Sequence, residues 1–376
     1  MRVVTFCHSL LSDWNHGNAH FLRGVATELV ARGHAVRAFE PAGAWSLLNL
    51  VADAGQAAVE DARRAYPTLD VARYDPATLD VDAAVDGADL VLVHEWNDPE
   101  VVRRVGDHRR RSRRPYLLLF HDTHHRAVTA PEEMAAYDLS GYDGVLAFGE
   151  ALREVYVARG WARRAFTWHE AADVRVFRPL EAPPEGDLVF VGNWGDDERT
   201  RELAEFLLEP VKALRLRARV HGVRYPPEGL AALSQAGAAY GRYLPNHRVP
   251  EVFARHRVTV HVPRGPYARA LRGIPTIRPF EALACGIPLA SAPWEDAEGL
   301  FAPGEDFLVA RTGDEMRAHL RAVLEDPALA ASLRARGLAA IRARHTCAHR
   351  VDQLLSIHAR LAGEALAHAP DPGRQR

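Results

Sequence analysis

The sequence has little cysteine and almost no lysine. The scarcity of cysteine excludes some classes of protein, and the scarcity of lysine determines which residue carries the positive charge. Its three cysteines, Cys7, Cys285 and Cys347, are too few and too far apart for a disulfide framework or a zinc ribbon. We therefore expect a reducing, cytoplasmic setting. Lys212 is the one lysine among 376 residues, so nearly all positive charge is carried by arginine.

Long apolar runs and a strong net charge are also missing. No run approaches the roughly 20 residues that a membrane span needs, and the opening MRVVTFCHSL predicts a strand rather than a secretion signal. The formal net charge of −2 gives no general attraction to nucleic acid. An arginine cluster from Arg103 to Arg114 could make weak peripheral contact with an anionic membrane, although a solvated helix end is the commoner fate of such a run.

The chain does contain short apolar runs that alternate with helix-period segments over nearly its whole length. This alternation predicts α/β architecture with parallel sheets covered on both faces. The expected strands are Val3 to Cys7, Ala35 to Phe39, Leu90 to His94, Tyr116 to Phe120, Gly144 to Phe148, Ala165 to His169, Asp187 to Val191, Arg217 to His221, Val258 to Val262, Ile287 to Ser291 and Phe307 to Ala310. The expected helices of the first half are Ala19 to Arg32, Trp45 to Ala65, Pro99 to Arg110 and Glu150 to Arg159.

The pattern restarts after the polar, proline-bearing stretch FRPLEAPPEG at 177–186. We predict two doubly wound, Rossmann-like domains with a cleft between them. The first takes residues 1–178 and the second 179–346. A last helix follows at 347–366, and 367–376 read as a disordered tail.

The segment from Pro275 to Ser291, PTIRPFEALACGIPLAS, predicts a short helix before a buried strand. Pro279 suits the first turn of a helix, and Gly286 suits its end. The N–H groups of Thr276 and Ile277 would be free to bind phosphate oxygens. Glu281 could then accept hydrogen bonds from ribose hydroxyls, and these features together outline a nucleotide-diphosphate pocket.

This segment resembles the donor-site signature of retaining GT-B glycosyltransferases, in which a glutamate, seven residues and a second glutamate precede a small-residue run ending in Cys-Gly. FEALACG matches the second half, whereas Gly273 stands at the first glutamate's position. With WHEAADVRVFRP and LFAPGEDFLVA, the chain looks most like the spore-maturation, CgeB-like branch. The resemblance implies two facing Rossmann-like domains, a last helix that crosses back onto the first, and transfer of a sugar from a nucleotide-diphosphate sugar.

The resemblance also implies which residues hold the donor. Asn193 and Arg199 stand where the family has an arginine and a lysine that bind the diphosphate. Arg199 keeps the positive charge of the lysine, whereas Asn193 lacks the charge of the arginine. Arg264 or Arg278 could supply the missing charge. A glycine loop would approach the diphosphate from the first domain, although an ordinary helix start with Asn18 as its cap is an equal alternative. The implied donor residues are Gly17, Asn18, Asn193, Arg199, Tyr243, Leu244, Arg264, Thr276, Ile277, Arg278 and Glu281, with Tyr243 and Leu244 under the base.

Strand ends of the first domain supply the candidates for catalysis and acceptor binding. In FHDTHHR, the resemblance implies that His121 contacts the transferred sugar, and Asp122 and His20 complete the predicted catalytic set. Glu95, Trp96 and His124 are predicted to face the acceptor, although a solvated loop remains the alternative for His124 and packing between domains for Trp96. Three histidines beside an aspartate could ligate zinc, but no further ligand completes a recognisable pattern.

The sequence therefore predicts a glycosyltransferase that needs no metal or other cofactor, because arginines and helix N-termini can neutralise the leaving diphosphate. Its partners would be a nucleotide sugar and an unidentified acceptor. Retention of configuration is implied by the resemblance; an inverting reaction would need a base, for which His16, His20 and His121 are candidates. A sugar-nucleotide epimerase and a catalytically weakened binding or assembly protein remain alternatives.

Overall fold

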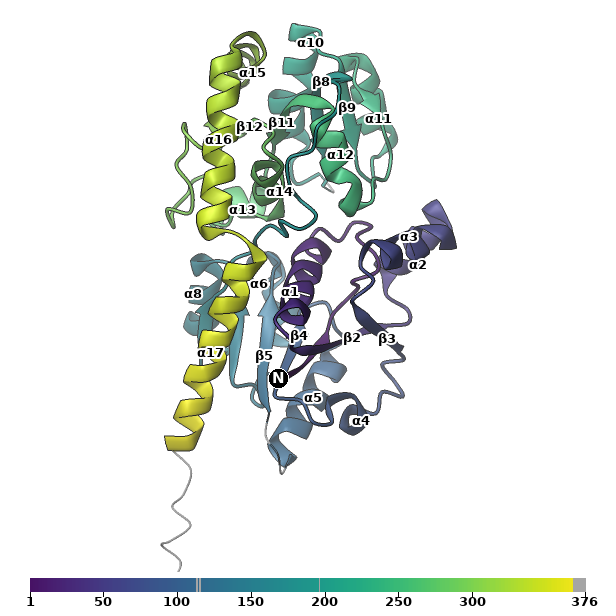
Figure 1. The fold of residues 1–376 in the computed structure, drawn as a ribbon, viewed down its shortest axis with the longest axis vertical. Coiled ribbons are helices and arrows are strands. Elements are labelled where there is room, and N and C mark those ends of the chain that lie inside the picture. The colour runs from purple at the N-terminus through teal and green to yellow at the C-terminus, as the bar shows by residue number, and fades with distance from the viewer. Residues whose placement is uncertain (113, 115, 196, 368–376) are drawn as a thin grey trace, which may run out of the picture.

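The chain folds around two separate parallel sheets, one above the other along the long axis (Figure 1). A computed structural model describes residues 1–112, 114, 116–195 and 197–367. Arg113 of the arginine cluster and the predicted tail from residue 368 onward lie outside these residues.

The first sheet takes its strands from the first half of the chain in the order β3-β2-β1-β4-β5-β6-β7. The central strands β4 and β5 are buried along their whole length, as expected when helices cover both faces of a parallel sheet. The strands are β1 (Arg2–Phe6), β2 (Ala35–Pro41), β3 (Asp70–Tyr74), β4 (Leu90–His94), β5 (Leu117–Asp122), β6 (Gly144–Ala147) and β7 (Ala165–Thr167). The helices are α1 (Ala19–Ala31), α2 (Trp45–Ala54), α3 (Gln56–Ala65), α4 (Val81–Val85), α5 (Pro99–Arg111), α6 (Arg126–Thr129), α7 (Pro131–Ala135) and α8 (Glu150–Ala158).

The second sheet follows with the order β10-β9-β8-β11-β12-β13, again with parallel neighbours. Its strands are β8 (Gly186–Val191), β9 (Ala218–His221), β10 (Ala239–Tyr240), β11 (His256–His261), β12 (Leu289–Ser291) and β13 (Leu308–Val309). Its helices are α9 (Thr200–Leu203), η1 (Ala204–Leu208), α10 (Glu209–Leu214), α11 (Pro227–Ala236), η2 (Asn246–Arg248), α12 (Val249–Ala254), α13 (Gly265–Arg269), α14 (Ile277–Cys285), α15 (Gly313–Glu325) and α16 (Pro327–Arg344).

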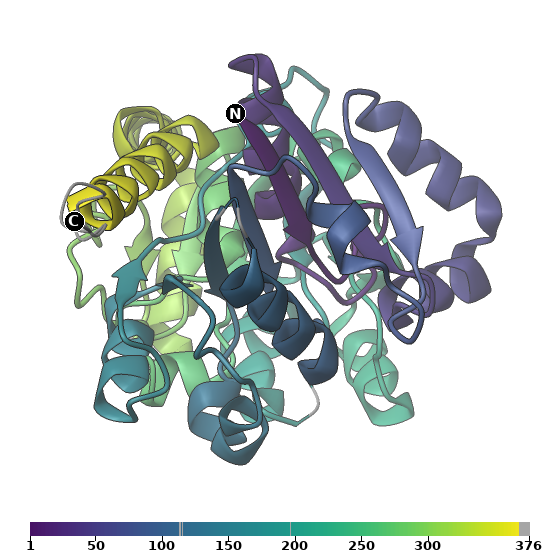
Figure 2. The same ribbon diagram turned by 90° about the horizontal axis from the view of Figure 1, so that it is seen from below.

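Several elements differ from the sequence-based expectations, and the short helices α4, α6 and α7 were not among those predicted. The edge strands β3 and β10 were not predicted, because β3 carries mixed polarity and β10 has only two residues. The single helix expected from Trp45 to Ala65 is two helices, since Gly55 adopts φ +75° and breaks the hydrogen-bond ladder. Figure 2 shows these two helices on the flank of the molecule opposite α17.

The last helix, α17 (Cys347–Ala367), leaves the second domain and runs along the first (Figure 1). It packs on α1, where Cys347, Val351 and Leu354 join the same buried cluster as Phe21. The approach is close: a Cβ added to Gly24 would lie 2.4 Å from the Cys347 sulfur. The two domains are therefore joined by this helix as well as by the linker after β7.

Most arginines of the cluster on α5 form ion pairs or hydrogen bonds within the protein. Arg103 pairs with Glu100 and Asp107, and Arg109 lies 3.2 Å from Asp143. Arg104 donates to backbone carbonyl oxygens, including that of Pro76 at 2.8 Å. Within the described ranges, the structure contains no helix that is both long and apolar enough to cross a membrane.

Candidate donor and acceptor cleft

A cavity of about 640 Å³ lies where the carboxyl ends of the two sheets face each other. Loops after β1, β4, β5 and β6 line it on one side, and loops after β8, β9, β10 and β11 line it on the other. Ligands of open α/β sheets bind at this edge, because the loops that vary freely converge there. The cavity is therefore the candidate functional site.

Most of the predicted donor residues line this cavity. They are Gly17, Asn18, Asn193, Arg199, Tyr243, Leu244, Arg264, Thr276, Ile277 and Arg278, to which the predicted acceptor residues Trp96 and His124 are added. The predicted residues that do not line it are Glu281, His20, His121, Asp122 and Glu95.

Arg199 differs from the other cavity arginines in its partners. Arg264 pairs with Glu198 at 2.6 Å, and Arg278 pairs with Glu281. The Arg199 guanidinium donates instead to the carbonyl oxygens of Val262, Asn193 and Trp194, and it forms no ion pair with the residues that the structure describes. Burial lowers its pKa to about 10. The cavity wall thus presents a guanidinium that forms no ion pair with a carboxylate of the described residues.

Asn193, which replaces a cation of the resembled pattern, connects the two domains. Its Oδ1 accepts from the N–H of Val223 at 2.8 Å, and its Nδ2 donates to Oδ1 of Asn15. Asn18 stands at the N-cap position of α1, but its side chain makes no capping bond and donates instead to Thr123, just after β5. Both asparagines therefore fix the cavity wall, which is a structural role that short polar side chains suit.

The helix α14 begins at the cavity, as expected, and Gly286 ends it with φ +66°. Thr276 precedes it with φ +56°, so the chain turns sharply at the point where Thr276 and Ile277 line the cavity. The N-terminus of this nine-residue helix can supply N–H groups and a partial positive charge to an anion.

Glu281 is placed differently from the prediction that it receives ribose hydroxyls. It is fully buried behind the wall, where Oε1 lies 3.1 Å from Nδ1 of His20 and accepts from Nδ2 of Asn246 at 2.6 Å, and Oε2 accepts from Arg278. Burial alone would raise the pKa of this carboxyl, but Arg278 together with His20 and Asn246 holds it below the ordinary value. In this arrangement Glu281 positions two residues that do line the cavity, Asn246 and Arg278.

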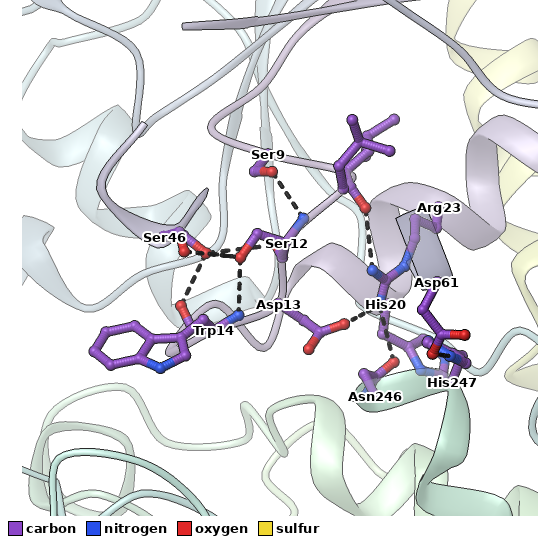
Figure 3. Close-up of polar contacts among 12 residues, drawn as sticks. Ser9, Ser12, Asp13, Trp14, His20, Arg23, Ser46, Asp61, Asn246 and His247 are labelled. Atoms are coloured by element: carbon purple, nitrogen blue, oxygen red, sulfur yellow. Dashed lines mark hydrogen bonds and ion pairs between the residues drawn. The ribbon is translucent and has the colours of Figure 1, made fainter. Parts of the chain in front are cut away.

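Further polar contacts cross from one domain to the other at the end of the cavity lined by Tyr243. The guanidinium of Arg23 donates to Asp13 at 2.9 Å and to Asn246 at 3.2 Å, and Figure 3 shows it between these two side chains. The hydroxyl of Tyr243 donates to the other oxygen of Asp13 at 2.7 Å. Asp13 therefore connects the glycine loop after β1 with the segment predicted to hold the base.

Two of the three residues predicted to be catalytic, His121 and Asp122, lie in the interior of the first domain, whereas His20 lies at the domain boundary beside Glu281. His121 is 2% exposed among the rings of Phe21, His94 and Trp168, and burial lowers its pKa to about 3. Asp122 accepts from the Tyr156 hydroxyl at 2.7 Å. These positions correct the prediction: strand β5 runs two residues further than expected, so both side chains are packed within the sheet layer and do not line the cavity.

Glu95 is likewise buried and does not face the cavity. It pairs with Arg126 at 2.6 Å, while burial and the neighbouring Asp122 raise its pKa to about 8. Trp96 lies beside Arg126, whose guanidinium carbon is 4.1 Å from the ring centroid. Trp96 and Trp45 also line a second cavity of about 500 Å³, so this tryptophan pair lies between the two cavities.

Sequence reasoning missed several cavity residues. Asp13, Asn246 and Tyr267 could have been found because each lies close in the sequence to a predicted site residue, in a segment that follows a strand. Glu170 follows β7 in the segment WHEAADV and carried the same signal, an acidic residue just past a strand end. Among the described residues, no group of three or more His, Cys, Asp or Glu side chains is arranged to hold a metal ion.

Comparison with known proteins agrees with this architecture. Residues 199–356 match the family described as Glycosyl transferase-like. No curated protein sequence matches the chain. Among solved structures, sucrose-phosphate synthase (tll1590) from Thermosynechococcus elongatus superposes with a TM-score of 0.65 at 15% identity, covering 97% of this chain and 100% of that one.

Two further structures are similar and contain UDP. Anabaena Alr3699/HepE in complex with UDP has a TM-score of 0.66 at 14% identity, covering 96% of this chain and 100% of that one. An α-glucosyltransferase (AGT) in complex with UDP has a TM-score of 0.67 at 10% identity, with 96% and 100% covered. The chain therefore has the two-domain α/β fold of GT-B glycosyltransferases, and its second half carries the sequence pattern of the Glycosyl transferase-like family.

Proposed function

We propose that this protein is a glycosyltransferase that binds a nucleotide-diphosphate sugar in the cavity between its domains and transfers the sugar to an acceptor. The single observation that carries the proposal is the Arg199 guanidinium, which lines the cavity without a carboxylate partner among the described residues. A partly buried cation of this kind favours an anionic ligand, and a diphosphate supplies oxygens for a guanidinium fork.

The surroundings of Arg199 support a diphosphate rather than a simple carboxylate. Arg264 and Arg278 line the same cavity, and the N-terminus of α14 opens into it. Together they distribute positive charge and N–H donors over the space that a leaving diphosphate would occupy. On this basis the transfer needs no metal ion, a point that activity in excess EDTA would test.

The nucleotide and the acceptor would then occupy opposite ends of the cleft. Tyr243, Leu244 and Asn246 line the end nearest β10, and they offer an aromatic face and polar groups to a base and ribose. Trp96, His124 and Trp45 line the first-domain side, next to the second cavity, and they offer flat apolar faces to an acceptor. Uridine is the first base to test, because similar structures hold UDP.

Retention of configuration is part of the proposal and follows from the donor-site pattern FEALACG. In a front-face reaction the leaving phosphate takes the acceptor proton, so a protein base is not required. Of the three candidate bases, His121 and His20 do not line the cavity, whereas His16 does.

The test is a turnover screen in which purified protein is incubated with UDP-, GDP-, ADP- and dTDP-sugars and the released nucleoside diphosphate is measured. Slow hydrolysis of one donor, accelerated by an acceptor and abolished in Arg199→Ala, is the expected result, and NMR of the product would give its anomeric configuration. Binding without turnover of any donor would favour a nucleotide-sugar-binding protein. A change of the sugar without release of nucleoside diphosphate would favour an epimerase.

A further inference from the structure

Glu170 is a buried acid whose carboxyl group makes no hydrogen bond to the residues that the structure describes. It lies three residues after β7, is 2% exposed and lines the cavity between the domains. Neither of its carboxyl oxygens has a hydrogen-bond partner among the described residues. Buried polar groups are nearly always paired, so an orphaned carboxyl at a cavity wall points to a ligand that pairs it.

The main chain around Glu170 is held firmly although its side chain is not bonded. Arg350 of α17 donates to the carbonyl oxygen of His169 at 2.9 Å and to that of Glu170 at 3.3 Å. The neighbouring Trp168 is buried, and its ring nitrogen donates to the carbonyl oxygen of Arg350 at 2.8 Å. The carboxyl is therefore presented from a fixed position, as a group that recognises a ligand needs to be.

The charges near Glu170 leave it without an ion-pair partner among the described residues. The nearby cation, Arg278, is already paired with Glu281, and the negative charge of Glu281 disfavours a second carboxylate close to it. Burial, and after it Glu281, raises the pKa of Glu170 to about 8. At neutral pH the group is thus mostly a neutral carboxylic acid, with one oxygen that donates and one that accepts.

We propose that Glu170 binds hydroxyl groups of the transferred sugar, and so selects donors whose sugar is hydroxylated on the face turned toward the first domain. A hydroxyl group both donates and accepts, which matches the two oxygens of a neutral carboxyl. The inference rests on the proposed function, because it requires a nucleotide sugar in the cavity. In this arrangement Glu170 binds the sugar, and Arg199 and the N-terminus of α14 bind the diphosphate.

The experiment compares two ligands on three proteins. Calorimetric titration with UDP and with UDP-glucose, and with the corresponding GDP, ADP and dTDP pairs, is carried out on the wild type, Glu170→Met and Glu198→Gln. Methionine is of similar size but offers neither the donor nor the strong acceptor of a neutral carboxyl, so Glu170→Met is expected to bind the nucleoside diphosphate within twofold of the wild type and the nucleotide sugar about tenfold more weakly, as for the loss of one strong hydrogen bond. Glu198→Gln, in the same cavity, removes the carboxylate charge beside Arg264 and is expected to alter both ligands by the same factor.

Melting temperature without ligand is the second readout. Because the Glu170 carboxyl has no partner among the described residues, Glu170→Met is expected to melt at the same or a higher temperature than the wild type. Equal weakening of both ligands by Glu170→Met, no weakening of the sugar, or melting several degrees lower would overturn the inference and leave the proposed function intact. Failure of the wild type to bind any nucleotide would overturn both.

Discussion

His20 and Glu281 face each other across the domain boundary, with Nδ1 of the imidazole 3.1 Å from Oε1 of the carboxylate. The N–H of Asp173 donates to Nε2 of the same ring at 2.9 Å, so Nε2 carries no proton and the remaining ring proton lies on Nδ1, toward Glu281. Glu281 is thereby tied to α1 of the first domain, and through Asn246 and Arg278 to the cavity wall. The carboxylate therefore fixes the position of α1 of the first domain relative to the cavity wall of the second domain.

Replacing Glu281 by glutamine should destabilise the protein because it leaves Arg278 without its counter-charge. Breaking a buried pair on one side costs about 3 kcal/mol, which urea unfolding followed by tryptophan fluorescence would measure. Glu305→Gln is the matched control, since Glu305 pairs with Arg336 on the surface and exposed pairs contribute less than about 1 kcal/mol. Equal midpoints for the two variants would contradict the structural role of Glu281.

The same carboxylate makes stability depend on pH at the acidic end. Its pKa in the folded protein is below the ordinary value, so its contribution to stability is complete above about pH 4.3. As the pH falls below that value, the unfolded chain binds a proton first and the contribution is lost. Glu281→Gln should therefore differ most from the wild type at neutral pH and progressively less as acid is added, which melting curves between pH 3 and 7 would show.

Glu170 should have the opposite effect, because its pKa in the folded protein is raised to about 8. The unfolded chain loses the Glu170 proton near pH 4.3, whereas the folded chain keeps it until about pH 8, so ionisation favours unfolding between these values. Glu170→Gln should gain stability over the wild type as the pH rises through this window, by no more than about 1.4 kcal/mol per pH unit. A constant difference from pH 5 to 8 would be inconsistent with a buried, unpaired acid.

The close contact between α1 and α17 can be tested by replacing two glycines with alanine. A methyl group at Gly24 would meet the Cys347 sulfur at 2.4 Å and Cβ of Asp173 at 2.8 Å, so Gly24→Ala should force these elements apart and cost about 1–3 kcal/mol. Gly363→Ala, on the same last helix with open space around it, should stabilise the helix by about 0.5–1 kcal/mol. Opposite signs in thermal unfolding are expected, and destabilisation of similar size by both changes would count against this packing.

The sequence predicts the cavity wall better than the interior behind it. Residues after parallel strands converge at one edge of a sheet whatever their distance in the chain, which favours a cavity position for Asn193 just after β8. Thr276 was predicted from the start of a helix, and Arg199 and Tyr243 from the family resemblance. The direction of a side chain near a strand end depends on where the strand stops. Strand β5 extends to Asp122, and this extension buries His121 and Asp122, which the sequence had assigned to catalysis.

Long-range partners explain the remaining differences. Arg278 is a local i,i+3 partner of Glu281 on α14, but His20 and Asn246 come from distant segments, and no local pattern predicts that they meet it. The edge strands β3 and β10 pair with a single neighbour each and carry weak apolar patterns. Glu170 shows the reverse case: its position after β7 was visible in the sequence, but only the fold reveals that its carboxyl lacks a partner.

The central claim, that the cavity binds a nucleoside diphosphate through Arg199, is tested most directly by calorimetric titration. UDP, GDP, ADP and dTDP would each be titrated into the wild type, Arg199→Ala and Arg201→Ala, the last being an exposed arginine two residues away that does not line the cavity. We predict that the wild type binds one of these nucleotides, that Arg199→Ala binds it at least about tenfold more weakly, and that Arg201→Ala matches the wild type. Unchanged affinity in Arg199→Ala, or no binding of any of the four by the wild type, would contradict the account.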